Sequence, residues 1–559
     1  MLEWLLRYRI AGFLLLWAGL LLGLHSSQQS YLAHDEGYYA QQARWILENQ
    51  DWITVGWWGK PVYDRTIGLQ WLMTLSYALF GFSEWAARLP STVAGLMAVL
   101  LTWRLGQQLS EKRVGWWGAA ILAVLPVWMQ ASQLGMQDVV LTAVELVGLW
   151  ALLAAEGAPS RHGRAAYLSR DWGRFGWGVV AGATVGLGFF IKTFMVVLPV
   201  LALMPYLLLE HRRHRHLANP GLYLGLGLGF LPVTLWLGLS MARYGSSPLE
   251  ELFGKVLALS RSDGLFESSA TPLFYFWNIP VNSFPWALFA IAGSILIWRT
   301  PGLSRKWLWL GYPLLLFLLL LAFKTRTWYY ALQLYPFIAL QAAFALNTLS
   351  ARYLSERPYQ RRLPLLLSWV VAAFGSLLLV AGLAVLLPLP GVPLELRPYG
   401  WVGLGGGLGW LVPLWVSQRD RHRARLMGQG WLWQMGWLLG PWLAIAAAFL
   451  TGLWGNYAPD LKTALQQPPI APVLEQHTVH FVQPDANAEA VLLTLYTPSL
   501  GSNLPSLEAL APGEYAWIEN SANQPLPPQY SVIETVRGWQ LVTLQNRESV
   551  VGAKRQPAA

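Results

Sequence analysis

Residues 31–70 read YLAHDEGYYAQQARWILENQDWITVGWWGKPVYDRTIGLQ, and this polar stretch lies between two apolar runs at 10–24 and 89–105. It carries an acidic pair, Asp35 and Glu36, followed by aromatic residues. The flanking runs are near the length that crosses a hydrocarbon core of roughly 30 Å. A loop so rich in ionisable and aromatic groups, held between two such runs, indicates a site at a membrane surface.

The composition extends this interpretation to the whole chain. Of the 559 residues 55% are hydrophobic and only 12% are charged, and the mean hydropathy is +0.38. The 33 Trp and 22 Tyr residues suit the two membrane interfaces, where one edge of a ring can be wet. We predict an all-α polytopic membrane protein with about 13 transmembrane helices. They are expected to begin near Ile10, Leu89, Val114, Val139, Phe175, Phe194, Leu222, Phe284, Trp307, Tyr329, Leu363, Trp401 and Trp431.

The net charge of +10 arises from short basic clusters between the predicted spans. This distribution favours orientation signals and contact with anionic lipids over nucleic-acid binding. With a cytoplasmic N-terminus, every even connection is basic, as the positive-inside rule requires. These inner connections hold Lys112 and Arg113; Arg161, Arg164, Arg170 and Arg174; Arg212, Arg213 and Arg215; Arg299, Arg305 and Lys306; Arg352, Arg357, Arg361 and Arg362; and Arg419, Arg421, Arg423 and Arg425.

The sequence divides into a membrane domain, residues 1–456, and an extracytoplasmic domain, residues 457–559. The first outer loop, 26–88, should contain two amphipathic helices in the interface plane, at 37–49 and 68–80. After residue 457 the β-type runs AVLLTLY, EYAWIEN and WQLVTLQ lie between turn signals and predict a small α/β domain.

Two glycine-rich runs, GLYLGLGLG at 221–229 and GLGGGLG at 403–409, superficially match phosphate-binding loops. Both lie inside apolar spans and lack the strand–turn–helix context of such loops. Close helix packing through small residues is the better interpretation. The absence of Cys excludes disulfides, thiolate nucleophiles and Cys-bound metals.

Carboxylates on the predicted outer face are candidate catalytic groups. Asp35 and Glu36 directly follow the first span, and Asp138 begins the fourth in GMQDVVLTAVE. Each can be interpreted as a helix-capping residue, favoured by the helix dipole. The alternative is a general base, whose basicity rises when it is partly desolvated.

Cations on the same predicted face are candidate phosphate ligands. Lys192 lies between two spans in GFFIKTFMVVLP and could instead snorkel to the interface. Basic residues in an outer connection run against the positive-inside rule, which favours an anion-binding role. The basic candidates are Arg65, Lys324 and Arg326, and Tyr329 and Tyr330 lie beside the last two in FKTRTWYY as further candidate phosphate ligands. Carboxylates suit proton transfer and cations suit a phosphate leaving group, so the pattern suggests group transfer from a lipid-linked phosphate.

The first outer loop resembles glycosyltransferase family 39, which includes protein O-mannosyltransferases and bacterial aminoarabinose transferases of lipid A. The resemblance is carried by HDEGYYAQQARWILENQDW and GKPVYDRTIGLQWLMTLSYALFGFSEWAARLPS, then by ASQLGMQD, GFFIKTFMVVLP, NSFPWALF and FKTRTWYYALQLYPFIAL. It covers about the first 350 residues in order.

The resemblance implies a GT-C fold, a polyprenyl-phosphate sugar donor and inversion at the anomeric carbon. Asp35 matches the family's general base, Glu36 its acidic partner, and Asp138 the second loop carboxylate that orients substrate. Lys192, and the cluster of Lys324, Tyr329 and Tyr330, fall where the family contacts the donor phosphate. An in-line displacement fits these roles, with the base on one side of the reacting carbon and cations on the leaving group.

Three departures from the family pattern bear on specificity. The relatives usually have an acidic residue, Lys and two prolines where this chain has Asp64, Arg65, Thr66 and Ile67. Tyr38 stands where some relatives have Arg. The aminoarabinose transferases also carry a His shortly before Pro272, whereas this chain reads SSATP. This difference argues against a metal site like theirs and against aminoarabinose specificity. No cofactor is predicted; the alternative is a divalent metal ion with His34, beside Asp35 and Glu36, as a ligand.

We predict a glycosyltransferase of the plasma (inner) membrane with its site and C-terminal domain on the extracytoplasmic face. The partners expected are a polyprenyl-phosphate-linked sugar, a lipid, glycan or protein acceptor and membrane lipids, with no nucleic acid. Three alternatives stay open: a ligase or polymerase of lipid-linked glycans, a transporter, and a non-catalytic polyprenyl-phosphate binder. Outer-face clustering of the ionisable groups argues against a transporter, whose ionisable residues favour the bilayer midplane.

Overall fold

The computed structural model describes residues 2–58, 60–157, 164–261, 271–388, 390–418, 428–484, 487–520 and 526–544. They form two compact units. The first comprises Met1–Ser27, Tyr63–Leu72 and Arg88–Trp454, and the second comprises Gln28–Val62, Met73–Ala87 and Gly455–Ala559. The basic cluster at 419–425 and Arg161 lie outside the described residues.

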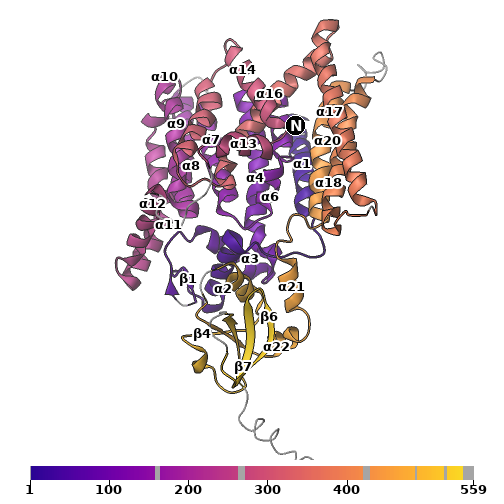
Figure 1. Cartoon of the computed structure of the whole chain (residues 1–559). Helices are drawn as coiled ribbons and strands as arrows, with labels where there is room; N and C mark the ends of the chain where they lie inside the picture. Colours follow the sequence, from indigo (N-terminus) through magenta and orange to yellow (C-terminus); the bar gives the residue numbers. More distant parts are fainter. Residues whose placement is uncertain are drawn as a thin grey trace, which may run out of the picture. The chain divides into compact units, whose positions relative to one another are not determined.

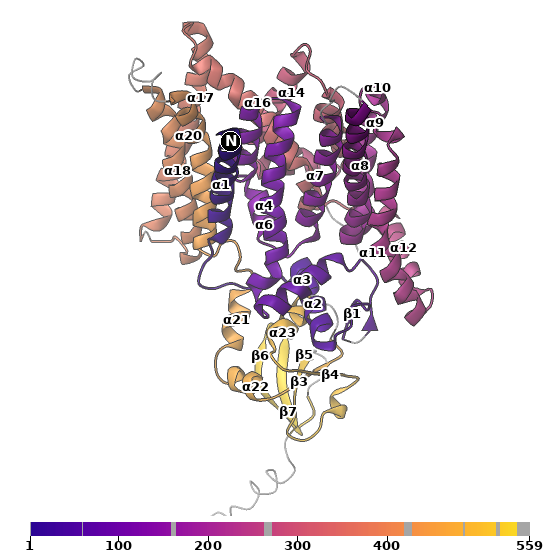
Figure 2. The same ribbon diagram turned by 180° about the vertical axis from the view of Figure 1, so that it is seen from behind.

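The first unit is helical. Its longer helices are α1 (Leu2–Gly23), α4 (Glu84–Leu109), α5 (Lys112–Leu122), α7 (Gln137–Glu156), α8 (Arg164–Lys192), α9 (Val197–Leu209), α11 (Pro220–Tyr244), α12 (Ser247–Arg261), α14 (Trp286–Arg299), α15 (Tyr312–Ala322), α16 (Tyr335–Tyr353), α17 (Pro358–Leu386), α18 (Arg397–Gln418) and α20 (Gln429–Leu450). Shorter pieces are α6 (Pro126–Ser132), η2 (Thr193–Val196), α10 (His211–His214), η3 (His216–Ala218), α13 (Phe274–Asn282), η4 (Trp307–Gly311), η5 (Trp328–Leu334) and η6 (Leu394–Leu396). Helices α17, α18 and α20 pack as one group, while α7, α8 and α11 pack as another (Figures 1 and 2).

Within the described residues, seven helical segments are long and apolar enough to cross a membrane, or nine if each of two bent pairs is one span. Two shorter apolar helices, Ala11–Gly23 and Trp307–Ala322, add to these. Each of the thirteen predicted starts lies within two residues of a helix or helical turn. The polytopic helical membrane fold is therefore confirmed, while the count of thirteen spans stays a prediction.

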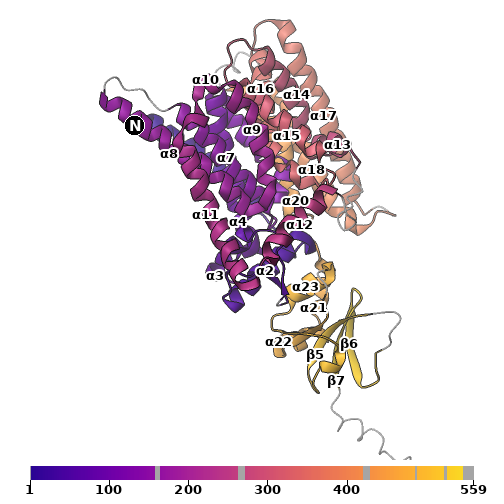
Figure 3. The same cartoon turned by 90° about the vertical axis from the view of Figure 1, so that its left-hand side faces the viewer.

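The glycine run at 221–229 confirms the predicted close packing. Helix α11 lies beside α8 (Figure 3), and Gly221, Gly225 and Gly229 face it. A Cβ atom at these positions would lie 2.0–2.2 Å from carbonyl oxygens of α8, closer than any side chain can approach. The missing side chains therefore let the two backbones meet. The second run, at 403–409, belongs to α18, which packs against α17 and α20.

The predicted first outer loop forms two helices and a short hairpin. Helix α2 covers Tyr38–Asn49 and α3 covers Gly68–Phe80, which confirms both predicted helices. Helix α2 buries Tyr39, Ala43 and Ile46, apolar residues at helical spacing, and Leu47 on the same face is partly buried. Strands β1 (Gly56–Trp57) and β2 (Lys60–Pro61) pair antiparallel. Helix α2 and the hairpin belong to the second unit, and α3 is divided between the two units.

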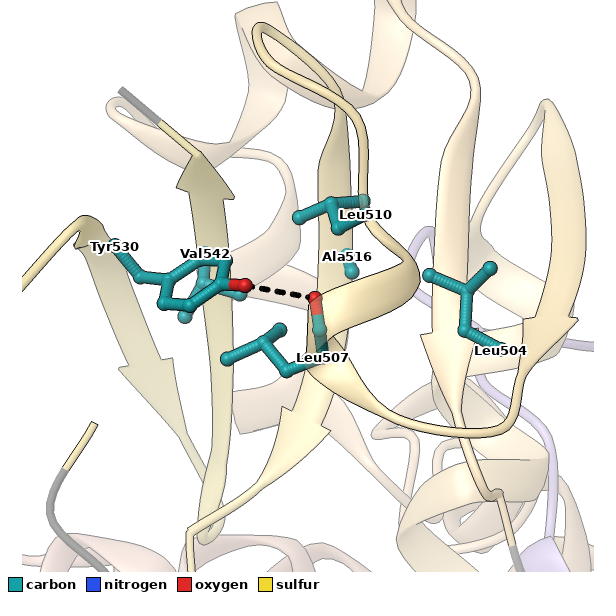
Figure 4. Packing of buried hydrophobic residues seen from close by; sticks show 6 residues of the cluster. All are labelled: Leu504, Leu507, Leu510, Ala516, Tyr530 and Val542. Carbon is teal, nitrogen blue, oxygen red and sulfur yellow. Dashed lines mark hydrogen bonds between the residues drawn. The ribbon is translucent and has the colours of Figure 1, made fainter. Parts of the chain in front are cut away.

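The C-terminal part of the second unit is the predicted small α/β domain. Helices α21 (Pro459–Leu465) and α22 (Ile470–Gln476) precede β3 (Val479–Val482), α23 (Ala488–Tyr496), β4 (Leu500–Leu504), η7 (Leu507–Ala509), β5 (Tyr515–Glu519), β6 (Tyr530–Val536) and β7 (Trp539–Leu544). The sheet order is β4-β3-β5-β7-β6, with β3 parallel to β4 and β5 and the other pairs antiparallel. Figure 4 shows its apolar core, where the Tyr530 hydroxyl donates to the Leu507 carbonyl at 3.0 Å.

One predicted strand is wrong. The run AVLLTLY lies in α23, a helix that connects β3 to its parallel neighbour β4. The side chain of Asn487 caps this helix by accepting from the Ala490 amide at 2.8 Å. An N-terminal cap and leucine-rich composition favour the helix over the strand that Val and Thr suggested. The runs EYAWIEN and WQLVTLQ coincide with β5 and β7 as predicted, with Gln545 outside the described residues.

Candidate functional site

A buried ion pair joins two predicted site residues of the first unit. Asp138 lies in the first turn of α7 and Lys192 is the last residue of α8, positions that the helix dipole favours for an acid and a base respectively. Lys192 Nζ donates to Asp138 Oδ2 at 2.5 Å, and the side chains are only 12% and 5% exposed. The two residues that sequence patterns singled out independently are therefore direct partners.

Two tyrosines of η5 complete this cluster. The ring centroids of Tyr329 and Tyr330 each lie 4.9 Å from Lys192 Nζ, a distance suited to cation–π attraction. The two rings meet edge to face at 5.2 Å. Lys192 thus sits against one carboxylate and two aromatic faces, and we name Asp138, Lys192, Tyr329 and Tyr330 the lysine cluster.

Lys324 and Arg326 precede η5 in the same segment. Lys324 is exposed. Arg326 Nη2 donates to the Leu321 carbonyl at 3.2 Å, and Nη1 donates to the Lys324 carbonyl at 3.4 Å. These two contacts tie the Arg326 side chain to its own connection. The phosphate-binding roles of both residues stay predictions.

Arg65 lies in a second cluster, centred on Asp64. Arg65 binds both carboxylate oxygens of Asp64, at 2.9 and 2.5 Å, and Lys255 Nζ reaches Oδ2 at 2.5 Å. Burial alone raises the pKa of Asp64, but the charges and hydrogen bonds of Arg65 and then Lys255 outweigh it and hold that pKa well below its usual value. Two cations on one carboxylate leave this group with a net positive charge.

Lys255 and Glu251 escaped the sequence analysis. Both lie in α12, and Glu251 Oε2 accepts from the Tyr63 amide at 2.8 Å. Their separation of four residues places them on one helix face. This spacing of two charged residues in an outer connection could have pointed to a site. It is common on exposed helices, however, and does not distinguish site residues from ordinary surface residues.

Asp35 and Glu36 belong to the second unit and behave differently from each other. Asp35 is partly exposed, and its Oδ1 accepts from the Tyr39 hydroxyl at 3.1 Å. Glu36 is fully buried, and its Oε2 accepts from the Leu32 amide at 2.8 Å. Of the acidic pair, Asp35 is the carboxylate that solvent can reach, whereas Glu36 closes the backbone of its own loop.

The backbone of Asp35 has an uncommon conformation. Its φ is 57° and its ψ is −78°, while the preceding His34 is extended. These values approach those of the rare γ-turn with positive φ, a strained arrangement for a residue with a side chain. Such outliers cost about 1–3 kcal/mol and persist only where the surroundings hold them, most often at functional sites.

Next to this segment, aromatic rings join the loop to the C-terminal part of the same unit. Tyr38 stacks on Trp57 with ring centroids 5.6 Å apart. Trp57 Nε1 donates to the Pro484 carbonyl at 2.9 Å, and Trp58 contacts Phe481 at 4.9 Å between centroids. These contacts position Tyr38, the residue found where some relatives have Arg.

An apolar cavity of about 330 Å³ lies within the first unit, between α7, α8, α9, α11 and α15. Leucine and valine side chains form most of its wall, with Glu145, Thr184, Tyr223 and Tyr312 as polar members. Glu145 Oε1 is buried and has no hydrogen-bond partner among the described residues. Glu145 is thus a carboxyl group in an apolar cavity that the sequence analysis did not single out.

Metal independence stays a prediction. The part of the chain that the structure describes holds no group of three or more His, Asp or Glu side chains suited to one metal ion. His34 is exposed beside Asp35.

Comparisons with known proteins agree with this architecture. The family of dolichyl-phosphate-mannose-protein mannosyltransferases matches residues 64–237. ArnT from Cupriavidus metallidurans bound to undecaprenyl phosphate has a TM-score of 0.68 and 18% identity, covering 97% of this chain and 98% of that chain. The archaeal oligosaccharyltransferase AglB from Archaeoglobus fulgidus has a TM-score of 0.51 and 13% identity, covering 89% of this chain and 65% of that chain.

Sequence relatives lead to the same group. Undecaprenyl phosphate-alpha-4-amino-4-deoxy-L-arabinose arabinosyl transferases from two Pseudomonas aeruginosa strains are 29% identical over 217 residues and 30% identical over 189 residues. These matches cover 38% and 34% of this chain, and 38% and 32% of the relatives. The chain therefore shares the fold of ArnT, and part of its sequence is similar to aminoarabinose transferases and protein mannosyltransferases; it spans well under half the length of these curated relatives.

The match to the mannosyltransferase family contains Arg65, Asp138 and Lys192 but begins after Asp35 and ends before Lys324. The proposed role of Asp35 as general base therefore rests on the local sequence resemblance and on the geometry around this residue. For the remaining predicted residues the structure supplies positions, and their roles in catalysis stay predictions.

Proposed function

We propose that this GT-C protein is a glycosyltransferase that moves a sugar from a polyprenyl-phosphate donor to an acceptor on the extracytoplasmic face of the inner membrane. The observation that carries the proposal is the lysine cluster. It assembles a cation, a carboxylate and two aromatic rings from three distant segments. The related ArnT structure holds undecaprenyl phosphate, which supports a donor of that class.

In the proposed reaction, Asp35 takes the proton from the acceptor nucleophile as it attacks the anomeric carbon. The bond from that carbon to the donor phosphate breaks with inversion, and the phosphate leaves on the polyprenyl carrier. An ammonium group has three N–H donors, and Lys192 uses one for Asp138. The others can bind phosphate oxygens as negative charge builds up on the leaving group.

Other parts of the first unit suit the same donor. Arg65 and Lys255 supply a second positive group near Asp64. The apolar cavity offers a lining that matches part of a prenyl chain. Glu36 is proposed to act on the position of Asp35, because its carboxylate is fully buried and bonded to the loop backbone.

The test is transfer by the purified chain in lipid nanodiscs. A panel of undecaprenyl-phosphate sugars should include 4-amino-4-deoxy-L-arabinose, the sugar in the relatives' names, and neutral hexoses. Mass analysis of the products identifies both sugar and acceptor. A chain that consumes none of these donors while binding undecaprenyl phosphate is a non-catalytic binder, and the proposal would then be wrong.

Asp35→Asn gives the sharper experiment. We expect it to abolish transfer because an amide cannot accept the proton, while expression and membrane insertion stay normal. Asp460→Asn is the matched control, since Asp460 forms an exposed ion pair with Arg537 in the same unit. Full activity of purified Asp35→Asn would exclude Asp35 as the base.

A further inference from the structure

The strained backbone at Asp35 needs support from its surroundings. The residue has positive φ, whereas both His34 and Gly37 have ordinary negative φ. A short stretch of this kind relaxes unless neighbouring atoms prevent it. The question is therefore which part of the molecule lies against residues 31–37.

Helix α23 of the C-terminal domain contacts both ends of that stretch. Within the second unit, the Tyr31 amide donates to the Tyr496 hydroxyl at 2.9 Å. A Cβ atom on Gly37 would lie 3.0 Å from Val491 Cγ1 and 3.3 Å from Leu495 Cδ1. The backbone that leaves Asp35 therefore rests directly on α23, and an added methyl group would force neighbouring atoms to shift by a few tenths of an ångström.

Arg44 fixes α23 to the helix that Asp35 leads into. It lies in α2 and is only 6% exposed. Its guanidinium donates to the carbonyls of Thr494, Thr497 and Pro498, at 3.2, 3.0 and 2.6 Å. The last carbonyls of a helix lack partners within it and attract a cation. Arg44 thus acts as the C-terminal cap of α23, supplied by the catalytic loop.

We propose that α23 is the support that holds Asp35 in its strained conformation, and that Arg44, Val491 and Tyr496 are positioning residues for the base. The C-terminal domain then has a defined task, which is to fix the carboxylate for proton transfer. This inference rests on the proposed function, because it assigns Asp35 the role of base. It predicts that loosening α23 lowers kcat and leaves donor binding intact.

Gly37→Ala tests the contact directly. Its φ of −65° allows alanine, so the new methyl group acts only through its contacts with Val491 and the Leu32 carbonyl. We expect a kcat about 10- to 100-fold lower, as for a small displacement of a catalytic group, with an unchanged KM for the donor.

Adding Val491→Ala to Gly37→Ala separates positioning from stability. The second substitution removes the methyl group that the first one meets, so kcat should recover in part. If Gly37→Ala acted only by destabilising the fold, the second substitution, which forms a cavity, would lower stability and activity further. A double variant no more active than Gly37→Ala overturns the proposal.

Arg44 provides an independent arm. Arg44→Lys keeps the charge but cannot reach three carbonyls at once. We expect both Arg44→Lys and Arg44→Ala to lower kcat, and the kcat of Arg44→Lys should lie between those of the wild type and Arg44→Ala. Val532→Ala is the control, because Val532 is 44% exposed on β6 of the same domain and should leave kcat unchanged. Arg44 variants with unchanged kcat contradict the proposal.

Hydrogen exchange distinguishes failure of this inference from failure of the proposed function. The Gly37 amide donates to the Leu32 carbonyl at 2.8 Å, so its exchange reports on the loop without any substrate. Val491→Ala and Arg44→Ala should speed this exchange in the full chain in nanodiscs, while Val532→Ala should not. Unchanged exchange overturns the support role. Faster exchange in these variants, together with no sugar transfer by the wild type, would show that α23 holds the loop and that the proposed glycosyltransferase function is wrong.

Discussion

The ion pair between Lys192 and Asp138 is buried on both sides, so each side chain depends on the other. Removing one partner of such a pair leaves an uncompensated charge and costs about 3–5 kcal/mol. We therefore expect Lys192→Met to lower the stability of the purified protein by that order. Thermal unfolding in detergent measures it.

Asp138→Asn combined with Lys192→Met should recover most of that stability, because the buried charge is then absent. Sugar transfer should stay low in both variants if the lysine cluster binds the donor. Lys112→Met, at an exposed position, should unfold like the wild type. A double variant as unstable as Lys192→Met would contradict the direct pairing.

Asp64 predicts a dependence of stability on pH. Its folded pKa lies below its unfolded value of about 3.9, so its stabilisation is complete only well above pH 4 and is lost as the pH falls towards and through the lowered pKa. Lys255→Met removes one of the two cations. We expect about 1 kcal/mol less stability at pH 7 and a smaller loss below pH 4, measured by unfolding across that range. If Lys255→Met lost as much stability below pH 4 as the wild type does, Lys255 would not be a partner that lowers the pKa of Asp64.

Individual site residues differed in how far the sequence revealed them. The sequence pointed to Lys192 because burying a charged side chain in a membrane protein is energetically costly. It pointed to Tyr329 and Tyr330 because they follow basic residues in an outer connection. Their meeting around Asp138 depends on helix packing between distant segments, which no local pattern encodes. Lys255 carried no comparable signal, since a charged residue on an exposed helix is ordinary.

At the scale of single elements, the apolar helices followed from length and hydropathy, whereas α23 did not. A seven-residue apolar run fits a strand or a buried helix equally well by periodicity. The deciding features were the Asn487 cap and the position between two parallel strands, which demands a crossover. The first is visible in the sequence, but the second appears only when the sheet is assembled.

Helix α11 offers a matched pair of glycines on opposite faces. Gly225 faces α8, where a Cβ atom would lie 2.0 Å from the Val179 carbonyl oxygen, while Gly227 has open space around it. We expect Gly225→Ala to destabilise the protein by about 1–3 kcal/mol through overpacking. Gly227→Ala should be neutral or stabilising by up to about 1 kcal/mol, because alanine favours the helix. If Gly225→Ala and Gly227→Ala changed the thermal stability equally, the close packing of α11 on α8 would be refuted.

At the scale of the whole molecule, the sequence separated the membrane spans from the C-terminal region but assigned the first outer loop to the spans. The structure instead groups Gln28–Val62 with Gly455–Ala559. Their pairing depends on contacts such as that of Arg44 with Pro498, between residues hundreds of positions apart. Composition and periodicity act over short windows, so they cannot reveal such a grouping.

The orientation of the chain in the membrane is the prediction on which the outer-face site depends, and the absence of Cys makes it directly measurable. Glu508→Cys places one thiol at an exposed position of the C-terminal domain, and Glu356→Cys places one in a basic connection predicted to be cytoplasmic. In intact spheroplasts, a membrane-impermeant maleimide should label Glu508→Cys alone, and both variants should react after lysis. The reverse labelling would place the basic connections outside, against the positive-inside rule, and would remove the basis for an extracytoplasmic reaction.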